Sequence, residues 1–271
     1  MEGPADLWGH IAANLSGDRA TEIDAIEEPT HENLAKILDD KSDVERLAHS
    51  ISLSLRNMDI AVEQISEFYN EKLVDLMAAK LLNGERSGSF ADSALYAHVH
   101  SFFLNLGAAR DYLSAMIAFR IGENPKKIDS LNKLRAALRV ENLSKDTLLN
   151  ILSIKGYLGR KSNTIDEVEA AGWLKDASEL RNTFVHKRPY GTMSLEQAGY
   201  ASAIDRDAGL YRYKRPFVTA RSAEYDILDL IALHYAKASG LFFECAAASG
   251  YDVAMMTFTD EDIISIEIHE S

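Results

Sequence analysis

Residues 43–77 read DVERLAHSISLSLRNMDIAVEQISEFYNEKLVDLM, and this stretch decides the fold class. Its apolar residues recur every three or four positions, which is the period of one face of an α-helix. The stripe consists of Val44, Leu47, Ile51, Leu55, Met58, Val62, Ile65, Tyr69, Leu73 and Leu76. With Ser42 or Asp43 as its N-cap, the stretch predicts one helix of about ten turns.

The same period predicts further helices on both sides of this one. A capping box, Thr164-x-x-Glu167, predicts the start of a helix that passes Gly172 and ends before Pro189. The other expected helices run from 92 or 93 to 121, from 128 to 138, from 145 to 155, and from a Ser222 cap to Gly250. Two long helices, shorter ones and a last long one predict an all-α, up-and-down helical bundle.

The chain divides into three expected segments. Residues 1–42 form an acidic N-terminal extension with a small helix at 31–38. Residues 43–250 form the bundle, and 251–271 form a tail whose alternating run at 263–268 favours a strand. Within the bundle, residues 190–221 are rich in glycine and basic residues, and this segment is either an irregular loop or a small β-hairpin.

Composition is that of a soluble globular protein. Of 271 residues, 46% are apolar and 26% charged, and no run of apolar residues is long enough to cross a membrane. The first residues lack the basic and apolar regions of a secretory signal. The single cysteine, Cys245, excludes an internal disulfide and is expected to be a buried small hydrophobe. We therefore expect a cytoplasmic protein without membrane contact.

Charge is unevenly distributed. The net charge is −13, which disfavours nonspecific binding of nucleic acid over the whole surface. Residues 181–221, however, carry eight Lys or Arg against three acids, so this segment is +5 and the remainder is −18. This basic segment is either a local site for a polyanion or a solvated loop.

The most informative short motif is Arg181-Asn182-Thr183-Phe184-Val185-His186, which continues into Lys187-Arg188-Pro189-Tyr190. An imidazole can take and give a proton near neutral pH, and a guanidinium can hold two phosphate oxygens. Arg181, Asn182 and His186 therefore suit phosphodiester chemistry without a metal or another cofactor. The simpler interpretation is that Arg181 is a surface charge and His186 a favourable cation at a helix C-terminus.

Residues five apart on an α-helix are separated by about 140°, so Arg181 and His186 point to different sides while the helix persists. The motif can act on one phosphate only if the helix unwinds before Pro189, or if a two-fold dimer brings two copies together. We therefore expect a homodimer whose groove contains both motifs.

The expected RNA contacts flank the motif or lie in the basic segment. Tyr211-Arg212-Tyr213-Lys214-Arg215 interleaves aromatic rings with cations, a pattern that suits stacking on bases while holding phosphates but that edge strands also show. The residues assigned to RNA binding are Lys187, Arg188, Tyr190, Arg212, Lys214 and Arg215. Elsewhere, His98 and His100 are too differently oriented to share a metal, and His234 is expected to be hydrogen-bonded in the core.

The motif and its helical setting resemble the HEPN family (higher eukaryote and prokaryote nucleotide-binding domains). That family is an all-α bundle marked by Arg, four to six residues and then His, often with Asn after the Arg, which here is Arg181, Asn182 and His186. The helix at 94–121, with Phe102-Phe103-Leu104 and Arg110-Asp111-Tyr112-Leu113, is similar to the family's long second helix. The resemblance covers roughly residues 43–250.

The resemblance implies a metal-independent endoribonuclease that cleaves single-stranded RNA, acting as a toxin or phage-defence effector with an antitoxin or defence partner. The alternative is a non-catalytic module that binds nucleotides or RNA or serves as a scaffold, and a third, weaker alternative is a structural helical protein without a ligand. Members paired with nucleotidyltransferase antitoxins tend to have Tyr two residues after the His, whereas this chain has Arg188 there and Tyr190 two residues later.

Overall fold

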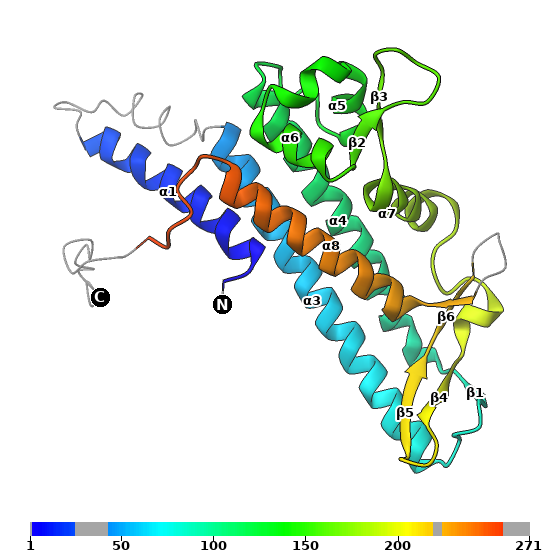
Figure 1. The fold of residues 1–271 in the computed structure, drawn as a ribbon. Coiled ribbons are helices and arrows are strands. Elements are labelled where there is room, and N and C mark those ends of the chain that lie inside the picture. Colours follow the sequence, from blue (N-terminus) through cyan, green and yellow to red (C-terminus); the bar gives the residue numbers. More distant parts are fainter. Residues whose placement is uncertain (1, 25–42, 219–223, 257–271) are drawn as a thin grey trace, which may run out of the picture.

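The computed structural model describes residues 2–24, 43–218 and 224–256, which form a mainly α-helical structure with a few short strands (Figure 1). The helix expected at 31–38 and the strand expected at 263–268 lie outside the described residues. No helix in the described part of the chain is both long and apolar enough to cross a membrane.

The two long helices predicted from the sequence are present as α3 (Asp43–Ala78) and α4 (Ser93–Arg120). Their apolar stripes are buried, because residues such as Ile51, Ile65 and Phe102 have no exposed surface. These two helices pack extensively on each other along their lengths (Figure 1).

Two polar contacts fix the direction of α4 relative to α3. Asn57 donates an amide N–H to Asn105 (3.3 Å), and further along α3 Lys72 pairs with Asp92 (3.1 Å), the residue before α4. Residue numbers rise along α3 in the direction in which they fall along α4, so the two helices are antiparallel. The short connection contains β1 (Arg86–Ser87) and a 3₁₀ turn, η1 (Phe90–Asp92).

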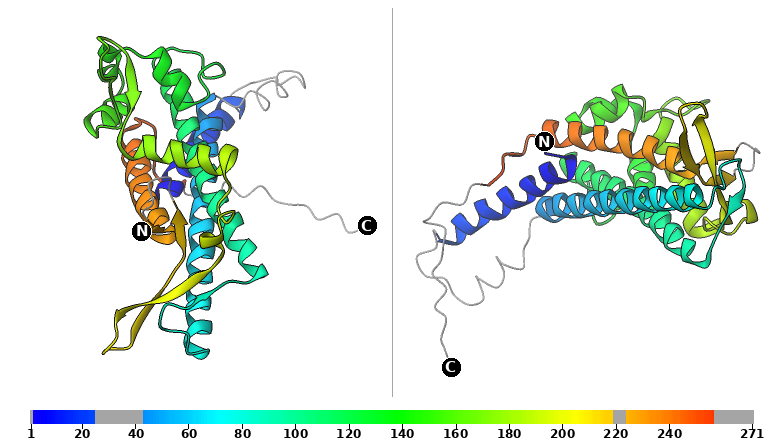
Figure 2. Two further views of the ribbon diagram at one scale, coloured as in Figure 1. Left: turned by 90° about the vertical axis from the view of Figure 1, so that its right-hand side faces the viewer. Right: turned by 90° about the horizontal axis from the view of Figure 1, so that it is seen from below.

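The N-terminal segment contains a helix that the sequence did not predict, α1 (Pro4–Asp24). It packs on α3 and on the last helix, α8 (Ile227–Ala248). Figure 2 shows these three helices side by side. Trp8 is fully buried, and its indole N–H donates to the carbonyl of Phe242 (3.0 Å). The segment expected to be an extension therefore contributes residues to the same hydrophobic core as 43–250.

Between α4 and the motif the chain forms short elements: α5 (Leu131–Ala137), η2 (Val140–Ser144), α6 (Thr147–Ile154), β2 (Leu158–Arg160) and β3 (Val168–Ala170). β2 and β3 pair as an antiparallel hairpin that the sequence did not predict. The capping box expected at Thr164 and Glu167 is wrong, because Thr164 closes the hairpin turn by donating to the carbonyl of Lys161. The next helix, α7 (Gly172–Asn182), begins at Gly172 rather than passing it.

The basic segment contains a β-hairpin, formed by β4 (Gly199–Asp205) and β5 (Leu210–Lys214). β1 pairs with β4, giving a three-stranded sheet in the order β1-β4-β5. A 3₁₀ turn, η4 (Ser194–Gln197), precedes it, and a second hairpin of β6 (Pro216–Val218) and β7 (Glu224–Asp226) follows. Of the two alternatives for this segment, the structure therefore contains the hairpin.

The start of the last helix differs from the prediction. α8 is capped by Asp226, whose carboxylate accepts from the backbone N–H groups of Leu228 (2.8 Å) and Asp229 (3.3 Å). Ser222, the expected cap, lies outside the described residues, and Glu224–Asp226, directly before the helix, form β7. An aspartate in extended conformation is as good an N-cap as a serine, and here the pairing of β7 with β6 selects the later one.

Candidate functional site

The Arg181–His186 motif spans a change of helix type. α7 ends at Asn182, and Thr183–Lys187 form a single π-helical turn, closed by the N–H of Arg188 donating to the carbonyl of Thr183 (2.7 Å). A π turn bonds residues five apart, so the two ends of the motif come nearer to one face than the α-helical 140° allows. The helix end thus departs from α geometry before Pro189, which is one of the two conditions that the sequence analysis set for action on one phosphate.

Arg181 reaches across from α7 to α4. Its side chain passes over Gly107, where even a Cβ atom would lie 2.5 Å from Arg181 Nε. Its guanidinium lies 3.7 Å from the carboxylate of Asp111, and 30% of the side chain is exposed. Its Nε is buried and has no hydrogen-bond partner, so the terminal nitrogens are the donors that a ligand can reach.

Asp111 was not predicted as a site residue, although it lies beside Arg181. One of its oxygens accepts from Nη2 of Arg110 (2.9 Å) and from the N–H of Leu131 (3.2 Å), while the other faces Arg181. Arg110 in turn donates to the hydroxyl of Ser178 on α7. The carboxylate therefore sits between two guanidinium groups and joins α4 to the helix of the motif.

The other two proposed catalytic residues of the motif, and Lys187 after it, face solvent. Asn182, His186 and Lys187 are exposed, and their side chains form no hydrogen bond or ion pair with the part of the chain that the structure describes. Because Arg181 is also partly exposed, the structure leaves the acid/base group and the cation of the motif accessible to a ligand.

Buried aromatic residues anchor the exposed motif. Phe184, in the middle of the π turn, is 2% exposed and packs on Phe103 (5.0 Å between ring centroids) and Phe217 (5.4 Å). Just beyond it, His100 Nε2 accepts from the backbone N–H of Tyr190 (2.9 Å). Burial lowers the pKa of His100, which favours the neutral ring that can accept this bond.

Two of the expected RNA-binding residues flanking the motif serve the fold. Tyr190 is 1% exposed and donates its hydroxyl to the carbonyl of Pro216 (3.0 Å), so its ring cannot stack on a base, and this expectation is corrected. Arg188 binds both carboxylate oxygens of the buried Glu196 (2.8 Å each) and the carbonyl of Val218 (2.9 Å). Its charge therefore compensates a buried carboxylate rather than standing free.

Arg215 is also corrected as an RNA contact, because it is fully buried. Its guanidinium pairs with Asp92 (2.6 Å), which is also buried, and donates to the carbonyl of Glu196 (2.7 Å) and the hydroxyl of Tyr96 (2.7 Å). A buried arginine needs such partners for all its donors. This network fixes the hairpin segment to the start of α4.

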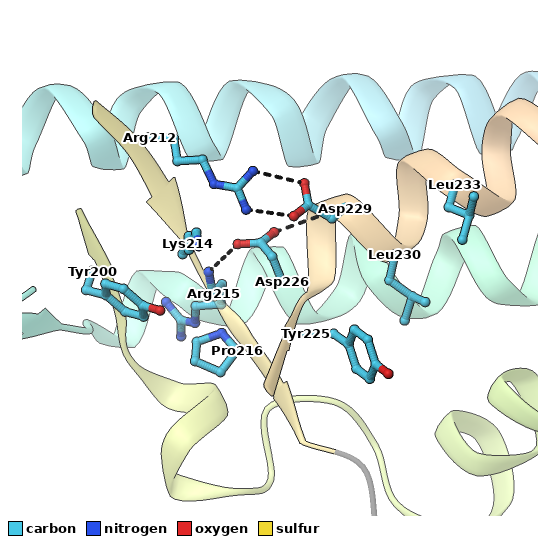
Figure 3. Close-up of a pocket in the computed structure, with 10 residues that line it drawn as sticks. All are labelled: Tyr200, Arg212, Lys214, Arg215, Pro216, Tyr225, Asp226, Asp229, Leu230 and Leu233. Carbon is cyan, nitrogen blue, oxygen red and sulfur yellow. Dashed lines mark hydrogen bonds and ion pairs between the residues drawn. The ribbon is translucent and has the colours of Figure 1, made fainter. Parts of the chain in front are cut away.

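Arg212 and Lys214 are partly exposed residues of β5, on its side near α8. They line a cavity of about 380 Å³ together with Tyr200 and Tyr225 (Figure 3). Arg212 pairs with Asp229 through both of its terminal nitrogens (2.6 and 3.4 Å), which neutralises its charge. Lys214 has no such ion pair among the described residues, so it is the freer cation of the two.

Two histidines have different surroundings. His100 is bonded as above, whereas His234 is 2% exposed and its Nδ1 has no hydrogen-bond partner, contrary to the expectation of a hydrogen-bonded core residue.

Within the described ranges, no group of three or more His, Cys, Asp or Glu side chains is arranged to hold a metal ion. Cys245 is buried, as expected.

Comparisons of the chain with protein-family models, with curated proteins and with solved structures found no match.

Proposed function

We propose that this protein is a metal-independent endoribonuclease with a HEPN-like helical bundle, which cleaves single-stranded RNA in the cytoplasm through Arg181, Asn182 and His186. The observation that carries the proposal is the π-helical turn after α7: the turn carries the accessible imidazole of His186, and the last turn of α7 carries the partly exposed guanidinium of Arg181. π turns occur mostly as single turns and are frequent at functional sites.

In this mechanism His186 takes the proton of the ribose 2′-hydroxyl as that oxygen attacks the adjacent phosphorus. The bond from phosphorus to the 5′-oxygen breaks, and the leaving oxygen takes a proton from water, to which His186 later returns the proton that it accepted. Arg181 stabilises the negative charge that develops on the phosphoryl oxygens, and Asn182 orients the imidazole or the phosphate. The products are a 2′,3′-cyclic phosphate and a 5′-hydroxyl.

Asp111 has a positioning role in this proposal. A carboxylate 3.7 Å from a guanidinium restrains it without occupying all of its donors. Gly107 completes the arrangement by leaving room for the arginine side chain against α4. A phosphate that reaches Arg181 therefore meets a cation already held in place.

The proposed active form is a two-fold dimer in which Arg181 of one subunit serves the phosphate attacked near His186 of the other. α4 offers a surface for such a contact, because Leu104, Tyr112 and Phe119 are 42%, 38% and 43% exposed. Their spacings of eight and seven place them along one side of the helix, and Tyr112 adjoins Asp111. Exposed apolar residues gathered in this way are typical of an interface.

The test is incubation of the purified protein with a single-stranded RNA and with the DNA of the same sequence, each with and without EDTA. The proposal predicts cleavage of the RNA alone, unaffected by EDTA, because the attacking 2′-hydroxyl is absent from DNA and no step uses a metal. Cleavage of the DNA, or RNA cleavage abolished by EDTA, would contradict the mechanism.

A second candidate is a non-catalytic HEPN-like protein that binds RNA or nucleotides, or that serves as a scaffold for an antitoxin or defence partner. The observation that favours it is the use of Arg188, Arg212 and Arg215 in ion pairs with Glu196, Asp229 and Asp92, which reduces the free positive charge near the motif. Under this alternative the RNA of the test is bound but remains intact.

A further inference from the structure

A cavity of about 610 Å³ lies between α7, α8 and the β6–β7 hairpin. Its walls are largely apolar, with Phe217, Val218, Leu230 and Leu233 among them. It lies on a different face of α7 from Arg181, because Leu180 lines it and neighbouring residues of a helix diverge by about 100°. Its size is within the range of small-molecule sites, about 300–1,000 Å³.

Two buried polar groups in the cavity wall lack partners. Trp173 and His234 both line it and are 4% and 2% exposed, and neither Trp173 Nε1 nor His234 Nδ1 has a hydrogen bond. Burial lowers the pKa of His234, so its ring is neutral and one nitrogen is an acceptor. An unsatisfied buried donor and acceptor cost stability, and their persistence together in one wall calls for an explanation.

The two rings are neighbours in this wall, with centroids 6.3 Å apart and planes inclined at 54°. A hydroxyl group fits both needs, because its oxygen accepts from the indole N–H while its proton is donated to the imidazole.

Charges of both signs lie at the rim of the same cavity. Asp176 and Glu179 on α7 and Lys237 on α8 line it, are exposed, and have no ion pair within the described part of the chain. Two carboxylates and an ammonium group on the rim of one cavity are complementary to a ligand that carries both charges next to each other.

We propose that this cavity binds a small zwitterion of the amino-acid type whose apolar body ends in a hydroxyl group, as a phenol does. The ligand's ammonium group faces Asp176 and Glu179, and its carboxylate faces Lys237. The apolar body packs on Phe217 and Leu230, and the hydroxyl bridges Trp173 and His234. This site is independent of the proposed ribonuclease chemistry.

The same cavity touches both ends of the π turn that carries His186. Thr183 and Arg188 line it, and the bond from the Arg188 N–H to the Thr183 carbonyl (2.7 Å) closes that turn. A ligand held against both residues stabilises the turn, so hydrogen exchange of the Arg188 amide slows when the ligand binds.

The test uses L-tyrosine as the probe and Trp173 as the reporter. The chain contains two tryptophans, so Trp8→Phe leaves Trp173 as the single tryptophan and also serves as a matched indole variant outside the cavity lining. We expect L-tyrosine to change the Trp173 fluorescence with saturable binding. L-Phenylalanine lacks the hydroxyl and should bind about tenfold more weakly. Tyramine and 3-(4-hydroxyphenyl)propionate each lack one charge and should also bind more weakly than L-tyrosine.

Calorimetry with Trp173→Phe isolates the indole N–H. This substitution should weaken L-tyrosine about tenfold and leave L-phenylalanine unchanged, since only the hydroxyl uses the lost donor. The exposed rim variant Asp176→Asn leaves the core intact and should weaken both amino acids. Absence of saturable binding at millimolar L-tyrosine, or equal loss of both amino acids in Trp173→Phe, would overturn the proposal and leave water as the partner of the two nitrogens.

Discussion

The side chain of Arg181 lies directly over Gly107 of α4, so closely that a Cβ atom at position 107 would stand 2.5 Å from Arg181 Nε. One residue without a side chain thus allows the arginine of the motif to reach Asp111, four residues further along the same helix. The position of the proposed catalytic cation therefore depends on a glycine 74 positions earlier in the sequence.

Gly107→Ala tests this dependence. The added methyl group must displace Arg181, so RNA cleavage should fall at least about tenfold, within the range for losing a charge-stabilising group. Gly240→Ala on α8 is the matched control, because a Cβ there meets nothing within 4 Å. It should leave activity unchanged and raise stability by up to about 1 kcal/mol through helix propensity. Equal activity of the two variants would argue against the positioning role of Gly107.

Arg215 and Arg212 form ion pairs of similar length in different surroundings, so the same substitution should have different costs. Arg215→Met breaks the buried pair with Asp92 and should destabilise the protein by about 3–5 kcal/mol. Arg212→Met breaks the exposed pair with Asp229 and should cost at most about 1 kcal/mol. Urea unfolding of both variants measures the difference, and similar midpoints would refute the structural role of Arg215.

The buried pair also predicts a pH dependence. Burial alone raises the pKa of Asp92, but hydrogen bonds from Arg215, Ser89 and Lys72 outweigh it, and the pKa is lowered. The contribution of this carboxylate to stability is therefore fully present above the unfolded pKa, about 4, and is lost as pH falls through the lower folded value. Below pH 4 the unfolding free energy of the wild type should fall more steeply than that of Asp92→Asn. Parallel pH curves would contradict this assignment.

Lys187 and Lys214 are the expected RNA contacts that remain without ion pairs among the described residues. If both contact phosphates, the double alanine variant should bind RNA more weakly and lower the slope of log K against log salt by about 1.4. Lys126 and Lys127 are exposed and are not among the expected RNA contacts, and their double alanine variant is the charge-matched control. A slope equal to that of the control would make the basic segment an ordinary solvated surface.

A shared active site predicts complementation between inactive subunits. In a mixed dimer of Arg181→Ala and His186→Ala chains, one of the two composite sites keeps both groups. With random mixing, half of the dimers are mixed, so roughly a quarter of the wild-type activity should return. Activity that stays at the level of the separate variants would show that each site is built within one chain.

The sequence predicted the long helices and the end of the motif helix well, because both depend on local signals. The three-to-four spacing from Val44 to Leu76 and the ring of Pro189 determine these features without tertiary information. The helix at Pro4–Asp24 was missed because the acidic composition of the whole N-terminal segment outweighed its short apolar set around Trp8.

The flanking site residues could not be assigned from the sequence, because their roles depend on partners far away in the chain. Arg215 forms a buried ion pair with Asp92, 123 positions earlier. The backbone N–H of Tyr190 donates to His100, 90 positions earlier. A run of basic and aromatic residues has the same sequence pattern whether its side chains contact RNA or a buried carboxylate. The close contact between Gly107 and Arg181 also joins residues far apart in the sequence, so it could not be predicted from the sequence either.

The central claim is tested most directly by single-turnover cleavage of a 5′-labelled single-stranded RNA, with analysis of the new 3′ ends. Wild-type protein should leave 2′,3′-cyclic phosphate ends, and His186→Ala should lower the rate at least about a hundredfold, the contribution typical of a general base. His49→Ala, which removes an exposed histidine from α3, should cleave as fast as the wild type. Cleavage by His186→Ala at the wild-type rate, or intact RNA with the wild type, would contradict a ribonuclease that acts through this motif.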